Sequence, residues 1–285
     1  MTLDDNWFSE IDPAANSAFS LKIRQQLHKE QSKYQRIEIF ETEGFGKLMT
    51  IDGLVMLSER DNFIYHEMMA HPVLFSHPSP KNIVIIGGGD CGTLKEVLKH
   101  PGIESVVQIE IDERVTRLAE EFFPTLCDSN NDPRARFLFD DGIRWMQEAS
   151  ANSVDVIIID STDPVGPAKG LFSADFYRDC YRALTQDGLL AQQSESPLYH
   201  NLTITKPMHE EMRKSGFIDT LTLFYPQPVY PSGWWSTTLA GKSAPITFLR
   251  EEQSAEKTFE TDYYNEAIHR SAMAVPEFIR RQMMG

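Results

Sequence analysis

Carboxylates follow four predicted strands of this chain of 285 residues. Asp90 lies in a glycine-rich loop after one strand, Glu110 ends the next, Asp141 follows a third and Asp160 ends a fourth. Because the carboxyl ends of parallel strands meet at one edge of a sheet, we expect these side chains to share a crevice. So much negative charge in one place requires a cation to neutralise it. The pattern therefore predicts a site for a positively charged ligand.

A metal ion is one candidate for that cation. Hard-cation sites usually draw their ligands from a compact loop or cage rather than from four separate strand ends. His200 and His209 are the histidines that suggest a metal, but they lack a matched set of partners. We therefore expect no metal centre and favour an organic cation.

The loop at 87–92 reads GGGDCG and matches the G-x-G-x-x-G pattern of dinucleotide-binding dehydrogenases, which makes that enzyme class an alternative. Its glycines are Gly87, Gly88, Gly89 and Gly92. A tight turn between strand and helix would explain them equally well. Asp90 argues against a pyrophosphate, because it places an anion among N–H groups that would otherwise face phosphate. Glu110 is placed to accept hydrogen bonds from ribose hydroxyls, so we expect a nucleoside.

The elements that must position these residues alternate between short apolar runs and amphipathic helices from residue 81 onward. This alternation predicts a doubly wound α/β sheet of the Rossmann-like methyltransferase type. The predicted strands are 83–86, 106–109, 136–139, 154–159 and 189–192, with an antiparallel edge at 219–224 and 234–240. The predicted helices are 93–100, 113–123, 174–184 and 201–214, and Asp112 is the expected N-cap of the second.

The first part of the chain has a different pattern. Apolar residues alternate or cluster at 34–40, 46–51 and 54–57, with a hairpin turn at Asp52-Gly53, and a helix over 61–71 is expected to end at Pro72. We expect residues 1–75 to form a small β-rich N-terminal domain with a linker helix. Residues 76–285 are then the nucleoside-binding catalytic domain.

Composition excludes several classes of function. The 27 Lys and Arg residues against 42 Asp and Glu residues give a net charge of −15, which argues against a nucleic-acid partner. Three cysteines without close pairing indicate a reducing compartment. The first residues lack the pattern of a signal peptide, and no apolar stretch approaches the roughly 20 residues of a membrane span. We expect a cytoplasmic protein that does not enter membranes.

The chain resembles the spermidine synthases of the polyamine aminopropyltransferase family. The patterns that carry this resemblance are LVMLSERDNFIYHEM at 54–68, GGGDCG at 87–92, EID at 110–112, DG at 141–142, DSTDPVGPAKGLF at 160–172, YPSG at 230–233 and YYN at 263–265. They cover nearly the whole chain in order. The resemblance implies transfer of an aminopropyl group from decarboxylated S-adenosylmethionine to putrescine, which yields spermidine and methylthioadenosine. It also implies a homodimer and no metal or redox cofactor.

The resemblance also implies a role for each matching residue. Asp160 would accept the proton, helped by a hydrogen bond from Tyr65. The residues implied for the donor nucleoside are Gln35, Glu110, Asp141, Gly142 and Pro167. The residues implied for the aminopropyl group and the amine are Asp90, His66, Ser161, Thr162, Asp163, Tyr230 and, closing the groove, Trp7.

Three positions depart from the family pattern or vary within it. Cys91 stands where the family usually has glycine, Lys169 replaces a residue that is commonly acidic, and His66 is glutamine in some relatives. Because the residue at the position of His66 varies, the acceptor amine stays open among putrescine, cadaverine, agmatine and spermidine.

Two further functions are alternatives. An S-adenosylmethionine-dependent amine N-methyltransferase would have to accommodate a donor carboxylate, which Asp90 would repel. A non-catalytic polyamine or nucleoside binder would have no need of Asp160.

Overall fold

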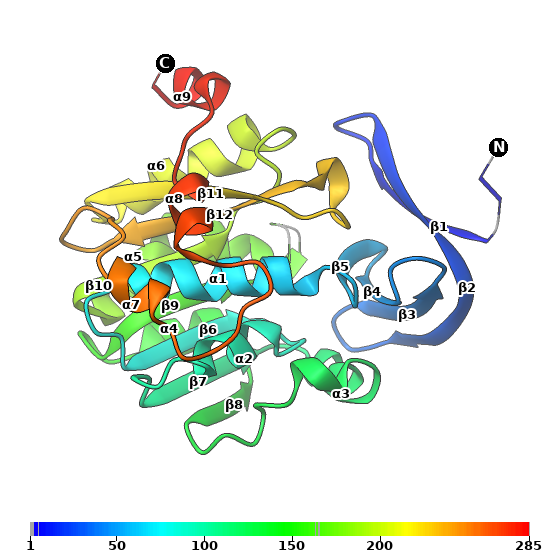
Figure 1. Cartoon of the computed structure of the whole chain (residues 1–285), viewed down its shortest axis with the longest axis horizontal. Helices are drawn as coiled ribbons and strands as arrows, with labels where there is room; N and C mark the ends of the chain where they lie inside the picture. Colours follow the sequence, from blue (N-terminus) through cyan, green and yellow to red (C-terminus); the bar gives the residue numbers. More distant parts are fainter. Residues whose placement is uncertain (1–2, 5, 163, 165, 285) are drawn as a thin grey trace.

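Two sheets make up the computed structural model, which describes residues 3–4, 6–162, 164 and 166–284. A five-stranded sheet has the order β1-β2-β3-β4-β5, and a seven-stranded sheet has the order β11-β12-β10-β9-β6-β7-β8 (Figure 1). Helices flank the larger sheet, so the predicted α/β class is confirmed.

The N-terminal sheet is antiparallel throughout. Its strands are β1 (Trp7–Asp12), β2 (Ser17–Gln31), β3 (Arg36–Thr42), β4 (Lys47–Ile51) and β5 (Leu54–Ser58). The predicted hairpin turn is present, with φ of 52° at Asp52 and 87° at Gly53. We did not predict β1 and β2, although Phe19, Leu21 and Ile23 alternate as a strand requires.

The larger sheet is parallel except at one edge. Its strands are β6 (Asn82–Gly87), β7 (Ser105–Glu110), β8 (Ala135–Phe139), β9 (Val154–Asp160), β10 (Leu184–Gln193), β11 (Asp219–Pro226) and β12 (Trp234–Gly241). β11 and β12 form the predicted antiparallel edge beside β10. β6 and β9 are neighbours, and their register pairs Gly87 with Asp160. This pairing brings the glycine-rich loop directly against the end of β9.

The helices are α1 (Asn62–Ser76), α2 (Gly92–Leu98), α3 (Glu113–Phe122), α4 (Gly142–Glu148), α5 (Ala174–Ala183), α6 (Lys206–Lys214), α7 (Glu251–Ala255), α8 (Glu266–Ala272) and α9 (Glu277–Met284). Shorter helical segments are η1 (Pro124–Leu126), η2 (Gly166–Phe172), η3 (Asn201–Thr205) and η4 (Pro231–Gly233). The helix predicted over 201–214 is divided into the π-helical η3 and α6. α4, α7, α8 and α9 were not predicted.

The prediction that the first helix ends at Pro72 is wrong, because α1 continues to Ser76. An internal proline costs roughly 3 kcal/mol. Burial of almost the whole helix offsets that cost, since every residue from Ile64 to Ser76 is buried. Arg250 also caps its C-terminus, with Nη2 donating to the Leu74 carbonyl at 2.7 Å and Nε donating to the His77 carbonyl at 3.0 Å.

The N-terminal sheet packs on α3. Buried side chains from β3, β4 and β5 form one cluster with Val115, Leu118 and Ala119 of α3. α1 packs with α2 and the larger sheet, in a cluster that also includes side chains of the N-terminal sheet, and its N-terminal end points toward that sheet (Figure 1). These contacts hold the smaller sheet over the ends of β6 and β7. Within the described part of the chain, no helix combines the length and apolar character needed to cross a bilayer.

Candidate active site

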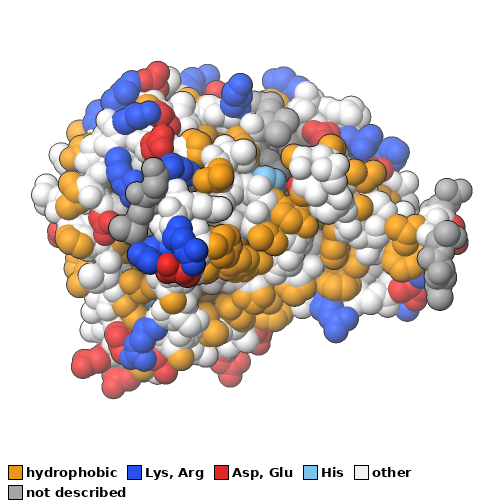
Figure 2. Space-filling model, turned by 90° about the horizontal axis from the view of Figure 1, so that it is seen from above, with side chains coloured by type: hydrophobic (Ala, Val, Ile, Leu, Met, Phe, Trp, Pro, Cys, Tyr) orange, Lys and Arg blue, Asp and Glu red, His pale blue; other side chains and the backbone are white. Residues whose placement is uncertain are grey.

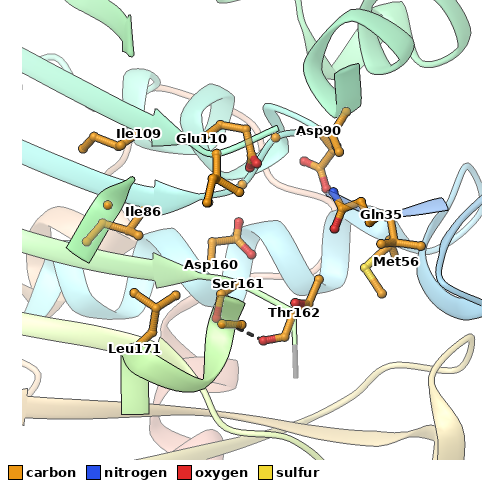
Figure 3. A pocket seen from close by; sticks show the side chains of 18 of the residues that line it. Gln35, Met56, Ile86, Asp90, Ile109, Glu110, Asp160, Ser161, Thr162 and Leu171 are labelled. Atoms are coloured by element: carbon orange, nitrogen blue, oxygen red, sulfur yellow. Dashed lines mark hydrogen bonds between the residues drawn. The ribbon is translucent and has the colours of Figure 1, made fainter. Parts of the chain in front are cut away.

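A cavity of about 170 Å³ lies where the carboxyl ends of β6, β7 and β9 meet the N-terminal sheet (Figure 3). The structure brings thirteen of the predicted site residues to its wall. They are Gln35, Tyr65, Gly87, Gly88, Gly89, Asp90, Glu110, Asp141, Gly142, Asp160, Ser161, Thr162 and Tyr230. The crevice expected from the strand ends is therefore present.

The other predicted site residues are placed differently. His66 and Gly92 do not line the cavity, but His66 contacts Asp90, which does. Trp7 is half-buried in β1, where it pairs with Lys22, and it is absent from the cavity wall. Pro167 lies in η2, and Asp163 lies outside the described residues.

Asp160 is buried at the end of β9, with a hydroxyl on each carboxylate oxygen. Tyr65 donates its phenol hydrogen to Oδ1 at 2.6 Å, and Thr93 donates to Oδ2 at 2.6 Å. Burial and the nearby Asp90 charge raise the pKa of Asp160, while the two hydrogen bonds oppose that rise. The raised pKa makes this carboxylate a better proton acceptor than an exposed aspartate.

The glycine-rich loop lies so close to Asp160 that no side chain fits at Gly87 or Gly88. The Gly88 N–H donates to the Asp160 carbonyl at 2.7 Å, and a Cβ on Gly87 would sit 2.1 Å from the same oxygen. Gly87 and Gly88 also have positive φ, of 82° and 65°. Both glycines are therefore required by close approach and by conformation.

Cys91 adopts the left-handed conformation, with φ of 70°, just before α2. For a residue with a Cβ this conformation costs roughly 1–2 kcal/mol relative to the right-handed region. The loop thus keeps the backbone that glycine would take, despite the departure from the family pattern. Lys169, the second departure, is exposed in η2.

The half-buried Asp90 forms an ion pair with the buried His66, whose Nε2 lies 3.2 Å from Oδ1 and 3.3 Å from Oδ2. Burial opposes both charges, but each charge stabilises the other. The result is a raised pKa for His66 and a lowered pKa for Asp90, whose Oδ1 also accepts from the Gly92 N–H at 2.7 Å. A Cβ on Gly92 would lie 2.2 Å from the His66 ring, so glycine makes room for the imidazole.

Glu110 is held through Asp112 to the N-terminal sheet. The Asp112 N–H donates to Glu110 Oε1 at 2.8 Å. Asp112 Oδ2 accepts from Ser32 at 2.6 Å and from Gln35 at 3.1 Å, and Oδ1 caps α3 as predicted. Burial raises the pKa of Glu110 to about 7, with the charges of nearby carboxylates adding to the effect and the Asp112 hydrogen bond opposing it.

One wall of the cavity is apolar. Ile86, Ile109 and Leu171 lie together on it (Figure 3). Gln35 and Met56 lie on the side of the N-terminal sheet. Apolar side chains on both sides with a few polar groups at the ends suit a flat aromatic base.

Tyr230 joins the two sheets at the cavity. Its hydroxyl donates to the Met56 carbonyl in β5 at 2.6 Å, and its ring packs edge-on against Tyr65 at 5.8 Å between centroids. Asp141 is exposed and caps α4, accepting from the Ile143 N–H at 2.8 Å. In the space-filling view, hydrophobic side chains gather in a band through the middle of the face, with charged side chains around it (Figure 2).

Sequence reasoning missed Thr93 and Ser32. Thr93 directly follows the glycine-rich loop and Ser32 lies three residues before Gln35, but the sequence gives no sign of which carboxylate either hydroxyl contacts. Among the described residues, no group of three or more His, Cys, Asp or Glu side chains is arranged to hold a metal ion.

Comparisons with known proteins match both parts of the chain. A spermidine synthase tetramerisation domain model matches residues 6–59, and a spermine/spermidine synthase domain model matches residues 62–250. The chain belongs to the spermine/spermidine synthase family. The resemblance inferred from the sequence motifs is thereby confirmed.

Two polyamine aminopropyltransferases match this chain over almost their whole length. The polyamine aminopropyltransferase of Thioalkalivibrio sulfidiphilus is 64% identical over 285 residues, 100% of both chains. That of Methylococcus capsulatus is 61% identical over 273 residues, covering 96% of this chain and 95% of the relative.

Solved spermidine synthases share the fold. A crystal structure with the transition-state analogue AdoDATO has a TM-score of 0.93 and 36% identity, covering 100% of this chain and 97% of that chain. The spermidine synthase of Thermotoga maritima has a TM-score of 0.90 and 36% identity, covering 98% and 94%.

Proposed function

We propose that this protein is a spermidine synthase, which transfers the aminopropyl group of decarboxylated S-adenosylmethionine to putrescine. The observation that carries the proposal is the buried Asp160, flanked by Asp90 and Glu110 at the wall of one cavity. The family match and the named relatives support aminopropyl transfer and give no support to N-methylation.

The reaction is an in-line displacement. The amine nitrogen attacks the aminopropyl carbon bonded to the sulfonium, the carbon–sulfur bond breaks, and its electron pair leaves with methylthioadenosine. Alkyl amines have pKa values of about 10, so the attacking nitrogen must lose a proton before or during attack. Asp160 Oδ1, beside the Tyr65 hydroxyl, takes that proton. The sulfonium is already a good leaving group, so alignment supplies most of the remaining catalysis.

The donor is held at both ends. Glu110 accepts hydrogen bonds from the ribose hydroxyls, and the Gln35 side-chain amide donates a hydrogen bond to them. The apolar wall contacts the adenine. Asp141 and Gly142 at the start of α4, together with Pro167, bound the adenine edge. Asp90 pairs with the aminopropyl ammonium and repels the carboxylate of the intact donor, which favours the decarboxylated molecule.

The acceptor amine lies on the Tyr65 and Tyr230 side of the cavity. The residues proposed to bind it or to close its groove are His66, Ser161, Thr162, Asp163, Tyr230 and Trp7. Putrescine is the proposed acceptor. This chemistry needs no metal or redox cofactor, and the three free cysteines support a cytoplasmic location.

We also propose that the enzyme is a homo-oligomer. The tetramerisation model that matches residues 6–59 supports assembly through the N-terminal sheet. Ile11, in β1, is 67% exposed, as an interface residue would be in an isolated chain. Light scattering measures the mass in solution and distinguishes the homodimer implied by the family resemblance from a tetramer.

The proposed reaction is tested with the purified protein, both donors and a panel of amines. We expect methylthioadenosine release with decarboxylated S-adenosylmethionine, fastest with putrescine. Methylated amine and adenosylhomocysteine from the intact donor would instead identify a methyltransferase. Tight methylthioadenosine binding without turnover of any pair would identify a binding protein.

Methylthioadenosine binding should weaken as the pH falls through about 7. Glu110 has its pKa raised to about 7, so acid adds a proton to the group that must accept hydrogen bonds from the ribose. The dissociation constant at pH 6 should be about tenfold higher than at pH 8, as one protonation within that range requires.

Titration calorimetry on two variants assigns this dependence. Glu110→Gln should bind weakly at every pH, with a flat profile. Asp160→Asn should keep a sloping profile, with its midpoint at lower pH because the Asp160 charge contributes to the raised pKa of Glu110. A Glu110→Gln profile as steep as the native one would contradict the assignment.

A further inference from the structure

Thr93 is a buried hydroxyl that the proposed mechanism has not used. It lies in the first turn of α2, directly after the glycine-rich loop, and it has no exposed surface. Helical threonines commonly bond back to the carbonyl four residues earlier. Thr93 instead donates to Asp160 Oδ2 at 2.6 Å.

We propose that Thr93 is a positioning residue for the proton acceptor, because its hydroxyl holds Oδ2 of Asp160 and leaves Oδ1 beside the Tyr65 hydroxyl at the cavity. This inference rests on the proposed function and deepens it. Thr93 does not line the cavity, so it acts on the substrate only through the carboxylate.

The surroundings explain why this carboxylate requires a second donor. Gly88 packs against the same oxygen, and a Cβ on this glycine would lie 3.0 Å from Oδ2, which leaves little room there for water. A buried carboxylate oxygen without a donor destabilises the ionised form. The Thr93 hydroxyl therefore supports the ionised Asp160 that the reaction needs.

Other titratable groups face Asp160 from each surrounding element. They are Tyr65 and His66 of α1, Asp90 of the glycine-rich loop, Glu110 of β7, Tyr225 of β11 and Tyr230. The acidic groups oppose ionisation of Asp160, and the positive charge of His66 favours it. Among the described residues, none of these titratable groups donates a hydrogen bond to Asp160 Oδ2. Thr93 supplies that hydrogen bond.

The test compares Thr93→Val and Thr93→Ser in the full-length enzyme. Valine keeps the shape and removes the hydroxyl, whereas serine keeps the hydroxyl and removes a methyl group. In the pH profile of kcat, measured with saturating donor so that the ribose already occupies Glu110, we expect the acidic limb of the valine variant to move upward by about one unit. Its kcat below the limb should therefore fall about tenfold relative to the native enzyme. Serine should leave the limb where the native enzyme has it.

Two controls separate this role from a purely structural one. Methylthioadenosine should bind both variants within about twofold of the native affinity at pH 8, because Thr93 is absent from the cavity wall. The melting temperature should be lower than that of the native enzyme for both variants, since each substitution removes a buried group. If the valine variant does not fold, Thr93→Ala removes the same hydroxyl with less bulk and carries the same expectation.

An unmoved acidic limb in the valine or alanine variant would overturn the proposal, and so would an equal shift in the serine variant. Failure of the proposed function is distinguishable, because the native enzyme would then release no methylthioadenosine from the decarboxylated donor.

Discussion

Asp160→Asn should lower turnover with decarboxylated S-adenosylmethionine and putrescine by about a thousandfold, within the range that general-base catalysis supplies. The amide cannot take the amine proton at Oδ1. It still accepts from Tyr65 and fits the same space, so the loop and the cavity should be preserved. Steady-state rates of methylthioadenosine release provide the measurement.

Binding and a matched variant control for damage to the fold. Asp160→Asn should keep the native affinity for methylthioadenosine within about threefold, since Glu110 and Gln35 hold the ribose. Asp187→Asn removes an exposed carboxylate that is absent from the cavity wall and should retain full turnover. Near-native turnover by Asp160→Asn would exclude Asp160 as the proton acceptor.

Asp90→Asn should weaken binding of the decarboxylated donor far more than binding of methylthioadenosine. The donor carries an ammonium that pairs with the half-buried carboxylate of Asp90, and methylthioadenosine lacks that group. Hydrogen bonds to charged groups contribute roughly 1.5–3 kcal/mol, so the donor should lose about 10- to 100-fold in affinity. Methylthioadenosine should lose about threefold or less.

Calorimetry with the two ligands measures both effects on one variant. Asp128→Asn serves as the matched control, because Asp128 is exposed and its partner Lys95 lies 3.7 Å away, outside the cavity wall. It should bind both ligands as the native protein does. If Asp90→Asn lost the same affinity for both ligands, the proposal that Asp90 binds the aminopropyl ammonium would be contradicted.

The strand ends of the larger sheet were predictable because buried parallel strands stand out in the sequence as runs of consecutive apolar residues. Runs such as 83–86 and 156–159 are continuously apolar, and a carboxylate at the end of such a run must lie at the sheet edge. Asp90, Glu110 and Asp160 could therefore be placed together from the sequence alone. Their common cavity follows from the pairing of β6 with β7 and β9.

Other features depend on tertiary contacts that spacing does not reveal. Pro72 predicts a helix end, yet α1 continues because the core surrounds it. β2 spans 15 residues, but many of its side chains are polar and Leu21 is its one buried residue, so the alternation of apolar and polar residues is weak. The hydroxyls of Thr93 and Ser32 reach carboxylates that are 67 and 80 residues away, and only the fold brings these pairs together.

The most direct test of aminopropyl transfer uses decarboxylated S-adenosylmethionine with one carbon isotope label in the aminopropyl group and a different one in the methyl group. After reaction with putrescine, mass spectrometry locates each label. We expect the aminopropyl label to appear in spermidine and the methyl label to stay in methylthioadenosine. A methyl label in the amine product would contradict aminopropyl transfer.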